Sequence, residues 1–282
     1  MITVVIPVYN RAKELKECLD SIEAQTYMPA KVIVVDDGST DDTVEVAKAH
    51  AINPVVVECS HIGAAAARNR GLELVETPWT MFFDSDDIML PDHIKKACEA
   101  IDDQTDMIGW NMKAISAGGV RICPFETVDI EWHNIMHGCL STQRYMARTE
   151  MFRKAVGWNE NIRIWMDIEL GARLLKLKPR IKKVAGISLI QNVIDNSITG
   201  PSFAHNADKF PAVLAALAET TDVKRLDLKK AILAADVARD NKKEGRKIFK
   251  SIENPGILLK IVYLYQKMGG RGAARLVRPF FK

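Results

Sequence analysis

The sequence has little that would tie it to an oxidising compartment. Its five cysteines are odd in number, dispersed and without a CxxC spacing, which favours reduced thiols and a cytoplasmic address. No basic segment precedes the first apolar run, which soon meets Pro7 and Asn10, so we interpret this run as a first strand and not as a signal peptide. Low-complexity tracts are also missing, and we expect the chain to fold throughout.

Common nucleotide and calcium fingerprints are absent as well. The first apolar run is not followed by GxGxxG, and GxxxxGK[ST] occurs nowhere, which argues against dinucleotide oxidoreductases and P-loop ATPases. Two acidic clusters, at 36–41 and 84–87, lack the spacing of an EF-hand loop.

The charge is distributed unevenly along the chain. Residues 222–282 hold 16 Lys and Arg against 6 Asp and Glu, a balance of +10, whereas residues 1–221 hold 23 against 30, a balance of −7. A basic block of this kind has an anionic partner or forms a solvated helical face. Few aromatic residues interleave with these cations and no nucleic-acid-binding module is recognisable, so we expect no nucleic-acid partner.

Apolar runs alternate with amphipathic helical patterns over the first 110 residues. The expected strands are Ile2–Val8, Lys31–Val35, Pro54–Glu58 and Trp79–Phe83, and the expected helices are 11–25, 41–50 and 63–75. Alternation of this kind with such apolar strands predicts an α/β fold, Rossmann-like, with a mostly parallel sheet covered on both faces.

The remaining sequence divides near residue 200. Before that point we expect a strand at Asp106–Trp110, a hairpin around 117–119 and a helix at 166–177. From about 203 the pattern is helical without strands, with breaks near Pro211, Asn241, Pro255 and Gly269-Gly270. The predicted organisation is a catalytic domain at 1–200, with halves 1–110 and 111–200, and a basic helical region at 201–282.

Polar residues follow each of the first four strands. They are Pro7-Val8-Tyr9-Asn10, then Asp36-Asp37-Gly38-Ser39-Thr40-Asp41, then Gly63 with Arg68-Asn69, then Asp84-Ser85-Asp86-Asp87. A sheet of this class binds its ligands at the carboxyl ends of its strands. These segments are therefore the candidate ligand site.

Each segment also has a purely structural interpretation. Residues 36–39 have the composition of a turn leading to a helix cap, and residues 63–71 that of a well-packed helix. The acids of 84–87 repel one another unless a cation is shared, and Mg²⁺ or Mn²⁺ is held by one or two carboxylates plus substrate phosphates. A solvated loop is the alternative for that cluster.

Together the motifs resemble a known family. The runs are Val4-Val5-Ile6-Pro7-Val8-Tyr9-Asn10, Val34-Val35-Asp36-Asp37-Gly38-Ser39-Thr40-Asp41, Gly63…Ala67-Arg68-Asn69-Arg70-Gly71 and Phe82-Phe83-Asp84-Ser85-Asp86-Asp87. In this order and spacing they look like the family 2 glycosyltransferases of the GT-A fold. The resemblance covers residues 1 to about 100 strongly and 145–175 moderately.

The resemblance implies a role for each donor-side residue. Pro7, Tyr9, Asp36 and Asp37 would line the nucleoside pocket of a nucleotide-sugar donor, with an aspartate binding the base, and Arg68 would support that pocket. Asp84 would face the ribose, and Asp86 would bind the Mn²⁺ or Mg²⁺ that bridges the donor diphosphate.

A second segment resembles the acceptor side of the family. It comprises Gly157-Trp158-Asn159-Glu160 and Trp165-Met166-Asp167-Ile168-Glu169-Leu170. The matching catalytic base is Asp167, which would take the proton of an acceptor hydroxyl in a single inverting displacement. Asp167 also suits the first turn of a helix, where the dipole favours an acid. Trp158 and Trp165 either stack against acceptor sugars or are buried.

Two positions depart from the family pattern. Met166 stands where many members have Glu before the base, and Ile194 stands where many have His near the segment 195–198. Asp86 is then left as the one evident protein ligand. A nucleotide-sugar-binding or regulatory protein without turnover is therefore the alternative function.

The function that we predict is inverting transfer of a sugar from a nucleotide-diphosphate donor, chiefly a UDP-sugar, to a glycan or lipid-linked acceptor, as in polysaccharide biosynthesis. The spacing of His133, His137 and Cys139 is compatible with zinc, but no fourth ligand accompanies it. We interpret these histidines as surface or acceptor-groove residues.

The C-terminus contains an apolar run that is too short to cross a bilayer. Residues 257–265 number far fewer than the about 20 apolar residues that a span needs. Arg271, Arg275 and Arg278 follow at helical spacing, with Phe280 and Phe281 beyond them. This pairing predicts peripheral contact of residues 257–282 with an anionic membrane, at its cytoplasmic face. The alternative is that 257–265 packs against the catalytic domain and the arginines are solvated.

Overall fold

The computed structural model describes residues 1–192 and 203–281, which form two compact units. The first unit comprises Met1–Ile130, Cys139–Glu160 and Arg173–Ile194, and the second comprises Glu131–Gly138, Asn161–Ala172 and Asp195–Lys282. The predicted boundary near residue 200 falls outside the described residues and stays a prediction. The segment 194–198, which contains Ile194, also lies outside the described residues.

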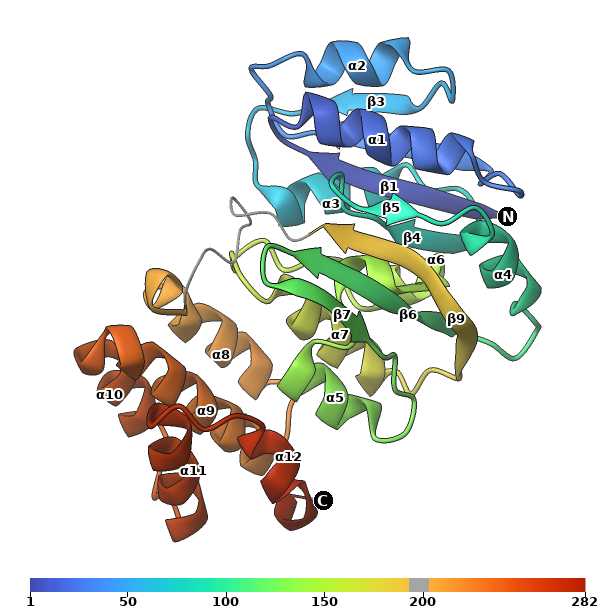
Figure 1. The fold of residues 1–282 in the computed structure, drawn as a ribbon. Helices are drawn as coiled ribbons and strands as arrows, with labels where there is room; N and C mark the ends of the chain where they lie inside the picture. Colours follow the sequence, from blue (N-terminus) through green and yellow to red (C-terminus); the bar gives the residue numbers. More distant parts are fainter. Residues whose placement is uncertain (193–202, 282) are drawn as a thin grey trace. The chain divides into compact units, whose positions relative to one another are not determined.

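A curled sheet of nine strands runs through the described part of the first unit (Figure 1). The strands are β1 (Ile2–Val8), β2 (Lys31–Asp36), β3 (Val55–Glu58), β4 (Trp79–Phe82), β5 (Ile88–Met89), β6 (Met107–Ser116), β7 (Gly119–Cys123), β8 (Tyr145–Arg148) and β9 (Ile181–Asn192). Their order is β3-β2-β1-β4-β8-β6-β9-β5, and β7 pairs with β6.

The sheet is mostly parallel, as predicted. β3, β2, β1 and β4 pair in parallel, and β6 and β9 run the same way, whereas β5, β7 and β8 run opposite. The predicted hairpin around 117–119 is confirmed as the turn between β6 and β7. In register, Val8 faces Asp36 and Asp36 faces Glu58, so three neighbouring strands end close to one level.

Helices cover both faces of the parallel half. These are α1 (Ala12–Glu23), α2 (Thr43–Ala49) and α3 (Ala64–Glu73). Further along the sheet, α4 (His93–Glu99) packs against β9 and α6 (Thr149–Lys154) against β8. Leu15 and Leu19 of α1 share a core with the alternate β1 residues Val4 and Ile6. Because successive strand side chains point to opposite faces, Val5 points the other way, to the face that α3 covers.

Helix α3 lies unusually close to the sheet. A Cβ added at Gly71 would stand 2.3 Å from Cγ1 of Val5 and 3.1 Å from Cγ2 of Val35. No side chain fits between this turn of the helix and the two strands, so glycine sets the helix-to-sheet distance.

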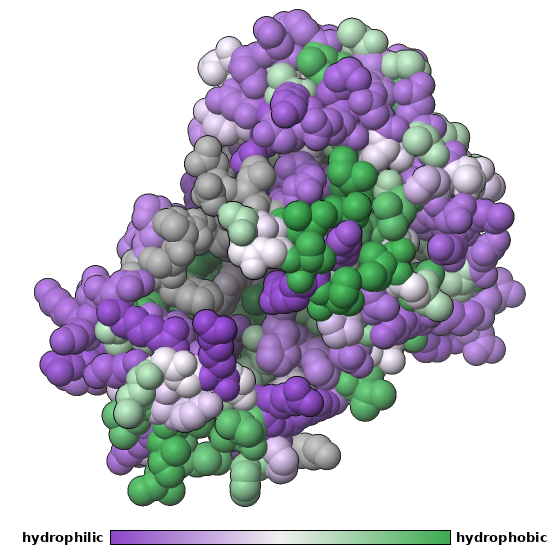
Figure 2. Space-filling view, in the orientation of Figure 1, coloured by the Kyte–Doolittle hydropathy of each residue, from purple (hydrophilic) through white to green (hydrophobic). Residues whose placement is uncertain are grey.

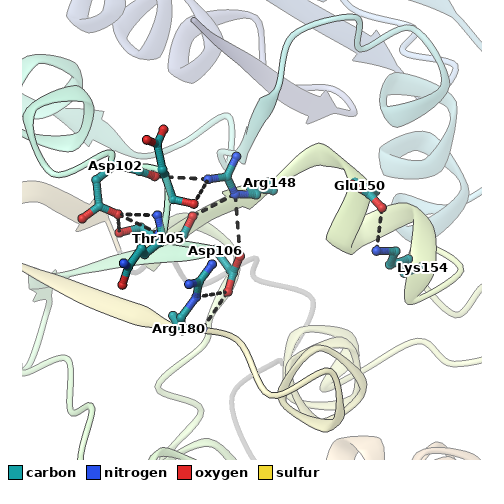
Figure 3. A network of polar contacts seen from close by, with 9 residues as sticks. Asp102, Thr105, Asp106, Arg148, Glu150, Lys154 and Arg180 are labelled. Atoms are coloured by element: carbon teal, nitrogen blue, oxygen red, sulfur yellow. Dashed lines mark hydrogen bonds and ion pairs between the residues drawn. The ribbon is translucent and has the colours of Figure 1, made fainter.

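A polar network joins β6, β8 and β9 away from the strand ends that were predicted to bind ligand (Figure 3). Oδ2 of Asp106 accepts from the backbone N (2.9 Å) and Nε (3.2 Å) of Arg180, and Nε of Arg148 donates to Thr105 O at 2.8 Å. Burial works to raise the pKa of Asp106, but the bonds from Arg180 and the nearby Arg148 outweigh it and lower the pKa. The network fixes the register of three strands where parallel and antiparallel pairing meet.

A histidine of α4, His93, is fully buried in the first unit. Nδ1 of His93 lies 2.9 Å from Oγ of Ser188, its ring packs edge-on against Trp110 at 4.4 Å, and its Nε2 is buried without a hydrogen-bond partner. Burial, with a smaller effect of Lys96, lowers the pKa of His93 to about 3. The ring is therefore neutral in the folded state throughout the ordinary pH range.

We expect His93→Gln to reduce the acid sensitivity of folding. Since the pKa is lower folded than unfolded, the wild type loses stability as pH falls from about 6.5 towards 3, by about 2 kcal/mol at pH 5. The variant should lack this part of the loss. Urea unfolding at pH 7 and pH 5 measures it, with the exposed His205→Gln as the matched control. Identical pH dependence in wild type and His93→Gln would remove His93 as the cause.

The described part of the second unit is helical. It contains α5 (Ile130–His137) and the start of α7 (Met166–Lys176), then α8 (Phe210–Ala218), α9 (Val223–Asp240), α10 (Lys242–Lys250), α11 (Ile257–Lys267) and α12 (Ala273–Val277). Helices without strands over 203–281 confirm the predicted pattern, and Asn241 both ends α9 and caps α10 through Glu244 N. The expected break near Pro211 is confirmed, because α8 begins at Phe210 and this proline lies in its first turn, where its missing N–H costs nothing.

Within residues 1–192 and 203–281, none of the helices is both long enough and apolar enough to span a membrane.

Candidate functional site

The first unit brings together most of the residues that the sequence singled out. Pro7 lies in β1 opposite Val35 of β2, and the backbone N of Asp37 donates to Val8 O at 2.8 Å. Beside β1, the backbone N of Phe83 donates to Val5 O at 2.9 Å, one residue before Asp84. The ends of β1, β2 and β4 thus place Tyr9, Asp36, Asp37 and Asp84 at one edge of the sheet.

Asp36 forms a tight turn and keeps one oxygen uncommitted. Its Oδ2 accepts from the backbone N of Gly38 (3.1 Å) and of Ser39 (2.9 Å), as the turn interpretation predicts. Its Oδ1 is buried and has no hydrogen-bond partner among the residues that the structure describes. Leaving such an acceptor unsatisfied costs about 1–3 kcal/mol, so the site is suited to a ligand that brings an N–H donor.

Asp37 has a different task, because its carboxylate organises the loop before α3. Its Oδ1 accepts from the backbone N of Ile62 (2.6 Å) and of Gly63 (3.1 Å). This loop carries His61, whose ring lies 4.4 Å from the half-exposed ring of Tyr9. The sequence analysis missed His61, since no pattern around residue 61 distinguishes it from an ordinary loop residue.

Arg68 of α3 connects the loop side to the acidic cluster. Its Nη2 donates to Oδ1 of Asp84 at 2.8 Å, and both side chains are largely withdrawn from solvent. The guanidinium lies 4.6 Å from the ring centre of Trp158. A charge-assisted bond and a cation–π contact together hold the Arg68 cation at the end of β4.

Trp158 is buried, the second of its two predicted alternatives. Only 2% of the residue is exposed, and its ring packs against Phe82 at 5.3 Å on one side and Arg68 on another. Asn69 fixes its backbone, donating to Trp158 O at 2.9 Å and accepting from Trp158 N at 2.7 Å. This packing leaves no face of the ring open to an acceptor sugar, and the ring supports Arg68 instead.

Three carboxyl groups gather after β4. Burial and the neighbouring Asp84 raise the pKa of Asp86 to about 6. Asp87 is 1% exposed, accepts from the backbone N of Asn192 at 3.1 Å, and has a pKa raised by burial and by both neighbours. A cluster in which burial and mutual repulsion disfavour ionisation is one that a divalent cation would relieve.

The cluster does not form a complete protein cage for a metal. Within the described residues, three ligand atoms of His, Cys, Asp or Glu converge at Asp20, Glu23 and His50, away from these strand ends. The acids after β4 therefore fit a cation that takes the rest of its oxygens from substrate, as Mg²⁺ and Mn²⁺ do with phosphates. The pair His133 and His137, with ring centres 5.9 Å apart, belongs to no such set within the described parts of the chain.

The predicted base lies in the second unit. Asp167 occupies the first turn of α7, as predicted, and its Oδ1 accepts from the backbone N of Ile168 at 2.9 Å. Asn134 of α5 donates to Ile168 O at 2.8 Å, which ties the start of α7 to its own unit. The helix-dipole interpretation is compatible with this position and does not compete with a catalytic role.

Trp165 is partly buried beside a perturbed lysine. Its ring centre lies 4.9 Å from that of Phe210 and 4.3 Å from Nζ of Lys229. Burial lowers the pKa of Lys229 to about 8, while the negative charges of Asp236 and Asp167 act in the opposite direction. No pattern in the sequence distinguishes Lys229, because it stands among six other cations between residues 224 and 243.

Comparisons with known proteins agree with these observations. The family described as "Glycosyl transferase family 2" matches residues 3–161. The uncharacterized glycosyltransferase YibD of Escherichia coli is 39% identical over 93 residues, which are 32% of this chain and 27% of YibD. The uncharacterized glycosyltransferase EpsJ of Bacillus subtilis is 24% identical over 216 residues, 71% of this chain and 63% of EpsJ. The chain thus spans less than two thirds of these relatives.

Solved structures share the fold. TarS 1–349 of S. aureus, in complex with UDP-GlcNAc, matches with a TM-score of 0.70 at 19% identity, over 99% of this chain and 91% of that one. The mannosyltransferase PcManGT of Pyrobaculum calidifontis, in complex with GDP-Man and Mn²⁺, matches with a TM-score of 0.62 at 16% identity, over 100% and 87%. With the family match over more than half of its length, the chain belongs to glycosyl transferase family 2 and has the GT-A fold.

Proposed function

We propose that this glycosyltransferase inverts configuration as it moves a sugar from a nucleoside-diphosphate donor, chiefly a UDP-sugar, to a glycan or lipid-linked acceptor, as in polysaccharide biosynthesis. The observation that carries the donor part is the Arg68–Asp84 pair beside Asp86 and the uncommitted oxygen of Asp36. The UDP-GlcNAc and GDP-Man complexes of the two structural neighbours support a nucleotide-sugar donor.

Each donor-side residue has a specific task in this proposal. Oδ1 of Asp36 accepts an N–H of the base, while Asp37 holds the loop that carries His61 against Tyr9. Pro7, in β1 opposite Val35 of β2, lines the nucleoside pocket. Asp84, oriented by Arg68, accepts a ribose hydroxyl, because its second oxygen is not used by that ion pair.

A divalent cation, Mn²⁺ or Mg²⁺, fits the acids after β4. Asp86 would hold it, and its charge would stabilise the diphosphate as that group leaves. The raised pKa of Asp86 and the burial of Asp87 support a cation-binding role for this cluster. The Mn²⁺ in the PcManGT complex supports the same choice of metal class.

Asp167 serves as the general base in the proposed reaction. Its carboxylate takes the proton of the acceptor hydroxyl as that oxygen attacks the anomeric carbon from the face opposite the diphosphate. The new glycosidic bond forms while the bond from the anomeric carbon to the diphosphate oxygen breaks, and the diphosphate keeps the electron pair. One displacement inverts the configuration at that carbon.

We also propose that the protein is cytoplasmic. Support comes from Cys18, Cys59, Cys98, Cys123 and Cys139, which are all free thiols. The alternative function, nucleotide-sugar binding without turnover, is favoured by Met166 before the base. Single-turnover consumption of a bound donor separates the two functions, because a binding protein leaves the donor intact.

A donor screen tests the proposed function directly. Thermal shift with UDP-, GDP- and other nucleotide-sugars, with and without Mn²⁺, is expected to show a rise in melting temperature for one nucleotide class that depends on the metal. Release of the free nucleotide in the presence of glycan acceptors then reports transfer. Absence of any nucleotide-dependent shift would contradict the donor assignment.

We expect Arg68→Met to weaken donor binding on the order of tenfold to a hundredfold, because the variant loses the charge-assisted bond that orients Asp84. Calorimetric titration of the donor measures the effect. Arg70→Met, two positions further along the same helix and paired with exposed Glu73, is the matched control. Equal donor affinity in the two variants would show that the Arg68–Asp84 pair serves folding alone.

A further inference from the structure

The outer face of α11 is apolar and exposed. Its first residue, Ile257, is 78% exposed, Ile261 is 56%, Leu264 is 54% and Met268, at the helix end, is 87%. The spacing of four, three and four residues places all of them on one stripe of the helix. Figure 2 shows hydrophobic surface gathered where Figure 1 draws α11.

The helix that carries this stripe is firmly attached within its unit. Its inner residues Leu259 and Val262 belong to the buried core of the second unit, and Tyr263 packs against Phe249 at 4.4 Å. Nε2 of Gln266 donates to Oδ1 of Asp236 of α9 at 3.0 Å. The outer stripe is therefore presented by a packed helix, not by a frayed end.

Cations border the apolar stripe and acids are missing from it. At 3.6 residues per turn, Lys260 and Lys267 lie roughly 60–80° to one side of the stripe. The exposed Arg271 and Arg275 follow in the next segment. From Ile257 to the C-terminal residue the sequence contains no Asp and no Glu.

The structure also corrects the sequence-based account of this region. Arg271, Arg275 and Arg278 do not share a helix, since Arg271 precedes α12 and Gly272 before it is left-handed. Arg278 lies 6.0 Å from the ring centre of Trp132, and Phe281 is buried. The surface consists instead of the outer stripe of α11 with its lysines.

We propose that this stripe of α11 docks on an anionic lipid bilayer, with the helix lying parallel to the surface. Aliphatic side chains enter the boundary between headgroups and acyl chains, and the bordering lysines contact acidic headgroups. The proposal stands independently of the glycosyl-transfer proposal, because it uses no residue of the donor or acceptor site.

A second copy of the chain is a poorer occupant than a bilayer. In a two-fold dimer the same patch meets itself, so the lysines and arginines of one copy would face those of the other, and residues 257–282 themselves supply no acid to pair with them. Nucleic acid would match the cations, but it offers no apolar surface for four aliphatic side chains. An anionic membrane matches both properties.

Co-sedimentation of the full chain with phosphatidylcholine vesicles, with and without phosphatidylglycerol, tests the proposal. We expect binding to the anionic vesicles only, and release by salt. Ile261→Gln with Leu264→Gln, and separately Lys260→Gln with Lys267→Gln, are each expected to lower the partition coefficient on the order of tenfold.

Matched controls come from exposed residues elsewhere. Val120→Gln with Ile122→Gln on β7, and Lys13→Gln with Lys95→Gln, remove the same chemistry from other surfaces and should leave sedimentation unchanged. Equal loss in control and α11 variants, or binding indifferent to lipid charge, overturns the proposal. So does a dimer in sedimentation velocity that the Ile261 and Leu264 pair variant abolishes while vesicles remain unbound. Donor affinity, measured in parallel, should not change in any of these variants.

Discussion

Asp167→Asn is expected to bind the donor normally and to transfer sugar about 10² to 10⁴ times more slowly than the wild type, the usual cost of losing a general base. The amide keeps the size of the carboxylate and can still accept from the backbone N of Ile168, so α7 should begin as before. It cannot take the acceptor proton. Initial rates of transfer at saturating donor measure the effect.

The donor serves as the internal control for this variant. Calorimetric affinity for the nucleotide-sugar should match that of the wild type, since the proposed task of Asp167 is to take the acceptor proton and not to hold the donor. Transfer at the parent rate would move the base elsewhere. Glu169, which is buried two residues further along α7, would then be the next residue to test by Glu169→Gln.

Asp86→Ala is expected to abolish metal-dependent donor binding. The carboxyl is held beside Asp84 and away from solvent, which raises its pKa to about 6 and makes the ionised form costly without a cation. Removing it should leave the metal-free protein folded at least as stably at pH 7, because an unfavourable charge is lost. Titration of a UDP-sugar with and without Mn²⁺ measures the loss.

An exposed aspartate provides the comparison for Asp86. Asp103→Ala removes a carboxylate from a solvated loop of the same unit and should retain the response to Mn²⁺. A response to Mn²⁺ that persists in Asp86→Ala would contradict the metal assignment. A lowered melting temperature without metal would instead show that Asp86 holds the fold together.

The sequence predicts best where strands are buried on both faces. All seven residues of Ile2–Val8 are buried, so their apolar run shows the strand at its true bounds. β9 (Ile181–Asn192) was not predicted, because it carries exposed Lys182 and Lys183 and is interrupted by Gly186. β6 extends to Ser116 and not to Trp110, since its second half is partly exposed and loses the apolar signal.

The sequence likewise predicts some features of the candidate site and misses others. Motif spacing predicted that the residues after β1, β2 and β4 would gather, and they do, because parallel strands end at one edge. It could not separate Asp36, which keeps a free oxygen, from Asp37, which is committed to the backbone of residues 62 and 63. That difference depends on which loop lies beside each carboxylate in the fold. Two adjacent aspartates look the same in the sequence, so the sequence cannot predict it.

The close packing of α3 on the sheet affects the position of a donor-site residue. Gly71 lies one turn after Arg68 on the same side of the helix, and the clearance at Val5 sets how far the whole helix stands from β1. Gly71, which contacts no ligand in the proposed site, thus helps to set the position of the Arg68 guanidinium over Trp158. Variants selected for new donors would accordingly include substitutions of the strand residues beneath α3, because the volumes of those side chains set the position of the Arg68 guanidinium.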